Sequence, residues 1–153
     1  MPDMERWPTV RLLSTAARVV ELAWNEKLSS MGLTHAGVIA MEVLAVKGAL
    51  SQAALAQIVR VQAQTMGKTL ARLESHGHIS RERSQTDRRS HLVTLTRAGA
   101  VALARAVELE RDVLGPVPVD TGRLRQELLT VVRDLAGRNS SQAMRGIVKP
   151  ERP

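Results

Sequence analysis

Polar and cationic side chains suited to contacting a polyanion are concentrated between residues 60 and 97. This stretch holds eight Lys or Arg and three acidic residues, a net charge of +5, whereas the whole chain has a formal net charge of +7. The positive charge is therefore local. Amide, hydroxyl and guanidinium groups can pair with base edges and with phosphates, so the region predicts a nucleic-acid surface.

The amino-acid composition limits the class of nucleic acid that the chain is expected to bind, and it excludes several kinds of chemistry. The chain of 153 residues has no cysteine, which excludes disulfides, thiolate metal sites and cysteine redox switches. It has two Trp and no Phe or Tyr, so the aromatic stacking typical of single-strand and RNA binding is missing and duplex DNA is favoured. The four histidines lack metal-ligand spacing, and we find no nucleophile elbow, phosphate loop or carboxylate pair. We therefore expect neither an enzyme nor a metal or other cofactor.

Nothing in the sequence has the pattern of a targeting or membrane segment. The N-terminal residues contain acids and a proline where a secretory signal needs an uninterrupted apolar run, and no segment approaches the length of a membrane span. We expect a cytoplasmic protein with no membrane partner. With 44% hydrophobic residues, the chain can bury the core of one compact domain.

Apolar spacing and capping residues predict a mostly helical chain with one small β-hairpin. Ile39, Val43 and Val46 are expected to form the apolar stripe of the second helix, and Thr34, Ser51 and Thr96 are N-cap residues. The first helix is expected to bury one face made of Leu13, Ala17, Val20, Trp24 and Leu28. The expected elements are, in order, helices over 8–31, 34–47 and 51–58, a turn over 59–61, a helix over 62–76, strands over 79–84 and 91–95, and helices over 96–114 and about 120–136.

The helix over 62–76, following a short helix and a turn, has the position of a recognition helix in a helix-turn-helix. Met66, Leu70 and Leu73 share one face and must point to the core, which leaves the opposite face to polar side chains. Residues near the N-terminus of such a helix reach deepest into a major groove, so Gln62, Gln64, Thr65 and Lys68 are predicted to contact bases and Arg72 a phosphate. The complete set of predicted DNA-contacting residues is Gln62, Gln64, Thr65, Lys68, Thr69, Arg72, Arg83, Asp87, Arg88 and Arg89.

Two further features adjoin this face. Gly67 lies inside the helix, where glycine costs roughly 1 kcal/mol relative to alanine; either a neighbour or the DNA approaches the backbone there, or the position is suboptimal. Between the two strands, Asp87, Arg88 and Arg89 follow a polar turn. The acid can brace the loop, and an Arg at its tip can enter a narrow, electronegative minor groove.

These residues resemble the MarR family of bacterial transcription regulators. The segment LARLESHGHISRERSQTDRRSHLVTLTRAG is similar to the end of that family's recognition helix, its Asp-x-Arg wing and the Leu-Thr-x-x-Gly that follows. The resemblance runs from about Pro8 to Ala136. It implies that Asp87 and Arg89 occupy the wing motif, with Arg89 in the minor groove and Arg88 on the backbone. The helix begins at Gln62, where members often have Ser or Asp, so its N-cap is expected to be weaker.

The resemblance also implies an architecture. We expect a single domain over residues 1–137, with dimerisation helices over 8–31 and 97–136 around a winged helix-turn-helix over 34–96, and a loosely held polar tail over 138–153. Two subunits would then place their winged helices on one pseudo-palindromic operator, as a repressor. The long terminal helices carry more apolar surface than one small winged helix needs, which independently fits a homodimer.

Regulation by a small molecule is a further expectation from the family. Many relatives release DNA when a small, often phenolic, anion enters a crevice between the dimerisation helices and the winged helix. Arg18, Trp24 and His35 lie where they could line or charge such a pocket, although Trp24 as plain core and Arg18 as a solvated charge are the alternatives. Cysteine-based sensing of oxidants is impossible in this sequence.

Three alternatives to a sequence-specific regulator stay open. The first is a sequence-indifferent architectural DNA-binding protein that draws its affinity from phosphate contacts. A winged helix used only for protein contacts is the second, although the Arg-rich hairpin argues against it. An enzyme is the third, without a motif to support it.

Overall fold

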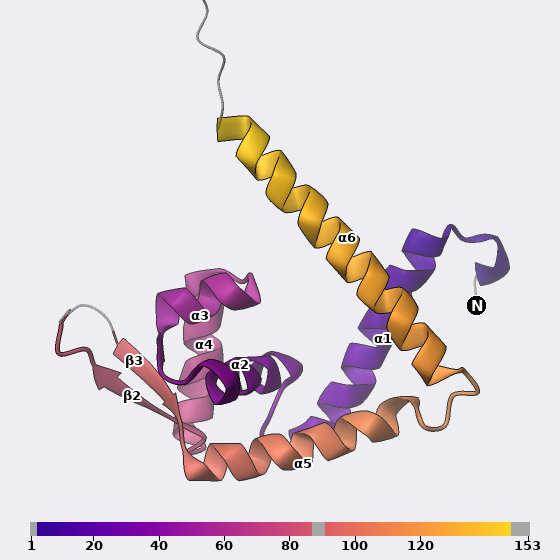
Figure 1. Cartoon of the computed structure of the whole chain (residues 1–153). Coiled ribbons are helices and arrows are strands. Elements are labelled where there is room, and N and C mark those ends of the chain that lie inside the picture. Colours follow the sequence, from indigo (N-terminus) through magenta and orange to yellow (C-terminus); the bar gives the residue numbers. More distant parts are fainter. Residues whose placement is uncertain (1–2, 87–90, 148–153) are drawn as a thin grey trace, which may run out of the picture. The chain divides into compact units, whose positions relative to one another are not determined.

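The computed structural model describes residues 3–86 and 91–147, and for residues 139–147 it describes only the helical backbone. The chain divides into two compact units, Met1–Gly115 and Pro116–Pro153. The first unit contains, in order, η1 (Met4–Arg6), α1 (Thr9–Ser29), α2 (His35–Lys47), β1 (Leu50–Ser51), α3 (Gln52–Val59), α4 (Ala63–Ser75), β2 (Ile79–Arg83), β3 (His91–Leu95) and α5 (Arg97–Leu114) (Figure 1). The second contains α6 (Thr121–Ile147). The expected fold, mostly helical with a small β-wing on a helix-turn-helix, is confirmed.

Side-chain caps start the helices where the sequence predicts them. Thr34, Ser51 and Thr96 each accept a hydrogen bond from the backbone N–H three residues later, at 3.2, 3.1 and 3.0 Å. Each bond satisfies an N–H that has no partner inside the helix and contributes about 1 kcal/mol. Gly48 ends α2 with a φ of 78°, a conformation that glycine adopts without strain.

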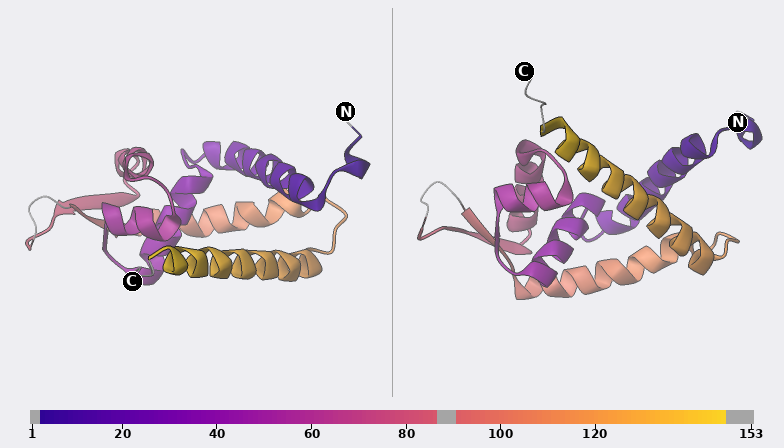
Figure 2. Two further views of the ribbon diagram at one scale, coloured as in Figure 1. Left: turned by 90° about the horizontal axis from the view of Figure 1, so that it is seen from above. Right: turned by 45° about the horizontal axis from the view of Figure 1, so that its top comes forward.

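The three strands form one antiparallel sheet in the order β1-β3-β2. β2 and β3 pair from Ile79 opposite Leu95 to Arg83 opposite His91, which confirms the predicted hairpin. β1 pairs Leu50 with Val93 on the other edge of β3, a strand that the sequence analysis did not predict. With only two residues, it is too short to show an alternating pattern. In both views of Figure 2, β2 and β3 extend away from α2, α3 and α4.

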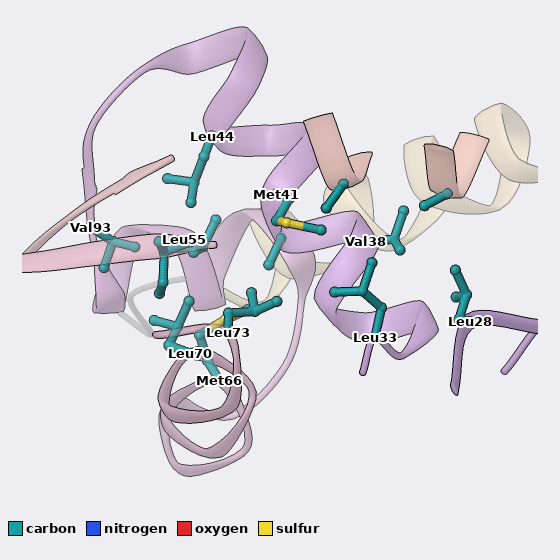
Figure 3. Close-up of a cluster of buried hydrophobic side chains, with 14 of the residues drawn as sticks. Leu28, Leu33, Val38, Met41, Leu44, Leu55, Met66, Leu70, Leu73 and Val93 are labelled. Atoms are coloured by element: carbon teal, nitrogen blue, oxygen red, sulfur yellow. The ribbon is translucent and has the colours of Figure 1, made fainter. Parts of the chain in front are cut away.

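The core of the first unit joins the helix-turn-helix to the sheet. Leu28, Met41, Leu55, Leu70 and Val93 come from α1, α2, α3, α4 and β3 respectively, and all are fully buried. They belong to one buried cluster with Leu44, Met66 and Leu73, which Figure 3 shows extending from Val93 at one end to Leu28 at the other. Burying each such side chain is worth about 1.5–3 kcal/mol, so five separate elements depend on one another for their positions.

The buried face of α2 differs from the expected one. Val46 is 81% exposed, and the buried residues are Val38, Met41 and Leu44, with Gly37 and Ala40. The predicted stripe is therefore wrong at Val46, whereas Ile39 and Val43 are partly buried and Val43 packs against the edge of the core. The helix is apolar on nearly all sides, so periodicity alone could not select the face that packs inward.

Only the C-terminal part of the predicted apolar face of α1 is buried. Trp24 and Leu28 belong to the core, whereas Leu13 and Val20 remain 37% and 36% exposed. None of the helices in the described residues combines the length and apolar character needed to cross a lipid bilayer.

The second unit begins as expected and extends further. The N–H of Arg123 donates to Asp120 Oδ1 at 3.0 Å, so Asp120 caps α6. The helix was expected to end at Ala136, but it continues to Ile147. Residues 137–147 are polar, and this suggested a tail, but they contain no proline and therefore nothing that forbids helix. The assignment of residues 1–137 to one domain stays a prediction, and residues 148–153 lie outside the described residues.

The junction between α4, β2 and α5 is closely packed. The N–H of Thr96 donates to the carbonyl of His78 at 3.1 Å, and its Oγ1 donates to the carbonyl of Gly77 at 2.6 Å. Gly99, in the first turn of α5, packs against the backbone of His78. A Cβ at position 99 would lie 2.7 Å from Leu95 Cδ1 and 2.9 Å from the carbonyl carbon of His78. The position therefore requires glycine for space.

We predict that Gly99→Ala destabilises the protein by about 2 kcal/mol, because backbone atoms cannot move aside without shifting α5. Urea unfolding measures the loss. Gly137→Ala is the matched control, since a Cβ there would meet nothing within 4 Å and alanine is favoured inside a helix by roughly 0.5–1 kcal/mol. Equal effects of the two substitutions would contradict the packing argument.

The imidazole of His78 makes stability sensitive to pH. Burial, and secondarily the nearby His76, lowers the pKa of His78 below its ordinary value of 6.5. Neither ring nitrogen meets a hydrogen-bond partner in the described residues. As the pH falls through 6.5, His78 becomes protonated in the unfolded chain but stays neutral in the folded protein. The folded protein therefore loses stability as the pH falls through this value.

We predict that unfolding at pH 5.5 needs less urea than at pH 7.5, and that His78→Gln reduces this difference. His91→Gln, at an exposed position, serves as the control and should leave the difference unchanged. An identical pH dependence in the wild type and His78→Gln would rule out His78 as its source.

Candidate nucleic-acid interface

The two faces of α4 differ sharply in burial. Met66, Leu70 and Leu73 are at most 2% exposed, as the sequence predicts. The opposite face carries Gln64 and Lys68, both exposed. Because the apolar face is fixed in the core, the polar face is held outward without help from any ligand.

The predicted base-contacting residues lie together at the N-terminal end of this helix. Gln62, Gln64, Thr65 and Lys68 are exposed within two turns. Gln62 occupies the N-cap position and makes no side-chain capping hydrogen bond, which agrees with the weaker cap expected there. Thr69 is half-buried, and its Oγ1 donates to the carbonyl of Thr65 at 3.2 Å. The helix itself therefore uses the hydroxyl of Thr69.

Arg72 has an internal partner. Its Nε donates to the carbonyl of Gly32, in the loop between α1 and α2, at 3.2 Å. This bond ties α4 to the loop that follows α1 and directs the guanidinium toward that loop. A phosphate contact by Arg72 stays a prediction. One N–H donor of its guanidinium is already used by the bond to Gly32.

Gly67 is explained by a neighbour. A Cβ at this position would lie 3.0 Å from Nε2 of Gln52, the first residue of α3. That amide donates to the carbonyl of Ala63 at 3.3 Å and so bridges the starts of α3 and α4. Of the alternatives left open by the sequence, a close neighbour accounts for the glycine.

The turn between α3 and α4 contains a strained residue that the sequence analysis did not single out. Arg60 has a φ of 62° and is the sole non-glycine residue with positive φ in the described parts of the chain. Its N–H donates to the carbonyls of Ala56 and Gln57 and so closes α3. The left-handed conformation costs a residue with a Cβ roughly 1–2 kcal/mol. The signal was the lack of Gly or Asn directly after a predicted helix end.

One Arg of the basic stretch is paired and positions the wing. The guanidinium of Arg81 donates to both carboxylate oxygens of Glu74, at 3.1 and 3.3 Å, and so links β2 to α4. The hydrogen bond from Arg81 lowers the pKa of Glu74 below its ordinary value. An exposed pair contributes little stability, but this one withdraws Arg81 from the set of cations facing outward.

Only the base of the wing is described. Arg83, the last residue of β2, is exposed, and Ser84 Oγ lies 2.9 Å from Thr86 Oγ1 in the turn that follows. Asp87, Arg88 and Arg89 lie outside the described residues. Their predicted contacts with the DNA stay predictions.

The structure brings together two of the three predicted pocket residues. Trp24 and His35 line a cavity of about 330 Å³, and their ring centroids lie 4.7 Å apart with an interplanar angle of 81°. Arg18 does not line this cavity; it belongs to a separate hollow beside Pro8 and Arg11. Two residues that the sequence analysis missed, Glu21 and Glu110, line the cavity in its place. Within the described residues, no group of His, Cys, Asp or Glu is arranged to hold a metal ion.

We predict that Arg60→Gly does not destabilise the protein and raises its free energy of unfolding by up to about 1 kcal/mol, because the relief of strain exceeds the added entropy of the unfolded chain. Urea unfolding is the measurement. A loss of more than 1 kcal/mol would show that the Arg60 side chain stabilises the turn. Arg105→Gly, at an exposed position in the interior of α5, is the contrasting control and should lower stability by about 1 kcal/mol.

Known proteins resemble this chain in both sequence and fold. The organic hydroperoxide resistance transcriptional regulator of Bacillus subtilis is 27% identical over 131 residues, which cover 84% of this chain and 89% of the relative. The transcriptional regulator HosA of Escherichia coli is 28% identical over 110 residues, covering 69% and 80%.

Solved structures share the fold. A crystal structure of MarR superposes with a TM-score of 0.75 at 24% identity, covering 90% of this chain and 96% of MarR. The C80S mutant of E. coli MarR, complexed with operator DNA, superposes with a TM-score of 0.66 at 23% identity, covering 86% and 98%.

The family model that matches the chain covers the helix-turn-helix. It is the model of the MarR family, and it matches residues 31–90. These residues include the capped α2, the bridged α3–α4 pair and β2. Residues 31–90 therefore match the MarR family model, and over most of its length the chain is similar to bacterial transcriptional regulators in sequence and to MarR in fold.

Proposed function

We propose that the protein is a sequence-specific transcription regulator that binds double-stranded DNA. The observation that carries this proposal is the exposed N-terminal end of α4, where Gln62, Gln64, Thr65 and Lys68 project from a helix whose other face is buried. An α-helix fits the major groove of B-DNA, and Gln and Lys can pair with adenine and guanine there. The structure of a MarR mutant complexed with operator DNA supports the proposal by analogy of fold.

The regulator is proposed to act as a homodimer on a pseudo-palindromic operator. Apolar side chains remain exposed along α1 and α5, among them Val10 at 79%, Leu22 at 63% and Val101 at 67%. A further row on α6 includes Val132 at 63% and Leu135 at 56%. Apolar surface of this extent is unusual on a monomer and is typical of an interface between subunits. Two subunits related by a two-fold axis would place two α4 helices about one DNA turn apart.

Repression and response to a small molecule complete the proposal. A repressor that is bound to its operator blocks transcription. A ligand that lowers its affinity for the DNA would relieve this repression. The relative from B. subtilis is named for organic hydroperoxide resistance. This chain contains no cysteine, so a thiol cannot be its sensor, and a cavity that binds a ligand is the better candidate.

Competition experiments separate this function from that of an architectural DNA-binding protein. A sequence-specific regulator prefers its site over unrelated duplex by a factor of roughly a thousand or more. An architectural protein that relies on phosphates shows no such preference. The probe is a duplex enriched from a random pool by the full-length protein, and the competitor is a scrambled duplex of the same composition.

We predict that Lys68→Ala weakens binding to the enriched duplex by about 5- to 100-fold and relaxes discrimination at one base pair, as expected for a lost base contact. Fluorescence anisotropy at fixed ionic strength measures the affinity. Lys27→Ala removes the same charge from the exposed last turn of α1 and should change affinity by less than about twofold.

Equal effects of the two lysine substitutions would remove α4 from the base-reading surface. If Lys68→Ala lowers the affinity for all duplexes alike and reduces the salt dependence, Lys68 contacts a phosphate. Failure of the wild type to bind any duplex at low salt would overturn the proposed function as a whole.

A further inference from the structure

The first turn of α4 is held weakly by its own residues. Ala63, Gln64 and Thr65 are all exposed, and the first buried side chain of the helix is that of Met66. Gln62, at the N-cap, makes no side-chain capping hydrogen bond. The buried side chains of α4 that Figure 3 labels all follow this turn. A helix end that lacks both a cap and a buried contact opens locally at a low cost in free energy.

One side chain from another element reaches this turn. Nε2 of Gln52, the first residue of α3, donates to the carbonyl of Ala63 at 3.3 Å. Among the described residues, no other side chain outside α4 forms a hydrogen bond with the turn. α3 itself is well anchored, because Ser51 caps it through the N–H of Ala54 and the side chain of Leu55 is fully buried. The amide of Gln52 therefore links a fixed helix to the loosely held start of α4.

Gly67 provides the space that this amide occupies. A Cβ at position 67 would lie 3.0 Å from Nε2 and 3.8 Å from Cδ of Gln52, and the first distance is shorter than an ordinary van der Waals contact. The amide is the far end of a flexible side chain, so it can move away from such a Cβ, but it would then lose its bond to Ala63. Gln52 and Gly67 therefore act as a unit.

We propose that Gln52 is a positioning residue for base recognition, whose amide holds the first turn of α4 in the geometry that base contacts require. Hydrogen bonds to base edges depend on narrow limits of distance and angle, whereas attraction to the phosphates does not depend on sequence. Loosening the turn therefore weakens binding to the preferred sequence more than binding to other duplexes. This consequence rests on the proposed function, whereas the effect of Gln52 on the turn of the free protein does not.

Amide hydrogen exchange, followed by NMR in the absence of DNA, tests the effect on the turn. The N–H of Met66 donates to the carbonyl of Gln62 at 3.0 Å, so its exchange rate reports opening of the first turn. Gln52→Ala should speed exchange at Met66 about 2- to 10-fold and leave that at Leu73, in the C-terminal half of α4, unchanged. Gln57→Ala removes an exposed glutamine from the same helix and is the matched control, with no effect at either amide.

DNA binding tests the effect on recognition. Gln52→Ala should lower the affinity for the enriched duplex about 2- to 10-fold and change that for the scrambled duplex by less than about twofold, as measured by anisotropy at fixed ionic strength. Gln52→Met keeps the length of the side chain but has no N–H donor, and it should behave in the same way. Gln57→Ala should change neither affinity. Equal losses for both duplexes would overturn the proposal.

The effect of Gly67→Ala should depend on the residue at position 52. In the wild type, this substitution displaces the amide and should reduce the preference for the enriched duplex as much as Gln52→Ala does. In the Gln52→Ala background, the added Cβ meets no other atom within 4 Å. There Gly67→Ala should leave the preference unchanged and raise the urea midpoint of unfolding. An equal fall in preference in both backgrounds would show that Gly67 makes room for the DNA, and it would overturn the proposal.

The two kinds of measurement separate the failure of this proposal from that of the proposed function. If hydrogen exchange responds as expected while the wild type binds no duplex, the proposed function fails and the hold of Gln52 on the turn stands. If the wild type prefers the enriched duplex while Gln52→Ala changes neither exchange nor preference, the positioning role fails and the regulator stands.

Discussion

The burial of one face of α4 is the constraint on which the candidate interface depends. Met66, Leu70 and Leu73 contribute to the same core as α2, α3 and β3, and each is worth about 1.5–3 kcal/mol when buried. Rotating the helix to hide Lys68 would expose all three. A single base contact is worth about 1–3 kcal/mol, less than the packing that orients the helix. The orientation of the polar face of α4 is therefore fixed in the free protein, and binding of DNA requires little reorganisation of this helix.

Two polar contacts couple this helix to its neighbours at either end. The amide of Gln52 joins the start of α3 to the start of α4, where Gly67 leaves room for it. At the other end, Arg72 reaches the loop between α1 and α2. That loop precedes His35, which belongs to the cavity lining. The candidate DNA surface and the candidate ligand site therefore share the same short segment of backbone.

Much of this arrangement could be read from the sequence because the signals were local. Thr34, Ser51 and Thr96 cap helices through bonds that span three residues, and the face of α4 follows from its own spacing. The predictions that were wrong concerned features that depend on tertiary context. The apolar sequence of α2 did not reveal which of its sides packs inward, and the two-residue β1 had no pattern of its own. Polar composition beyond Ala136 suggested a tail where the backbone remains helical.

The residues of the candidate sites divide in the same way, into those predictable from local sequence and those that depend on tertiary packing. The predicted base-contacting set needed only helix periodicity, whereas the internal bonds of Thr69 and Arg72 appear only when the neighbouring turns are in place. Glu21 could have been found, since it lies four residues after Ala17 and three before Trp24 on the predicted helix face. Glu110 could not, because its place in the same cavity lining as Glu21 depends on how α5 packs against α1.

Site-directed cleavage of DNA tests the outward face of α4 most directly. The chain has no cysteine, so Ala71→Cys, at an exposed position on α4, places one iron-chelate label on the proposed surface, and Ala104→Cys places one on α5 as a reference. With the label at position 71, we expect cuts in the enriched duplex in two clusters about ten base pairs apart. Diffuse cleavage, or a pattern equal to that from position 104, would contradict the account.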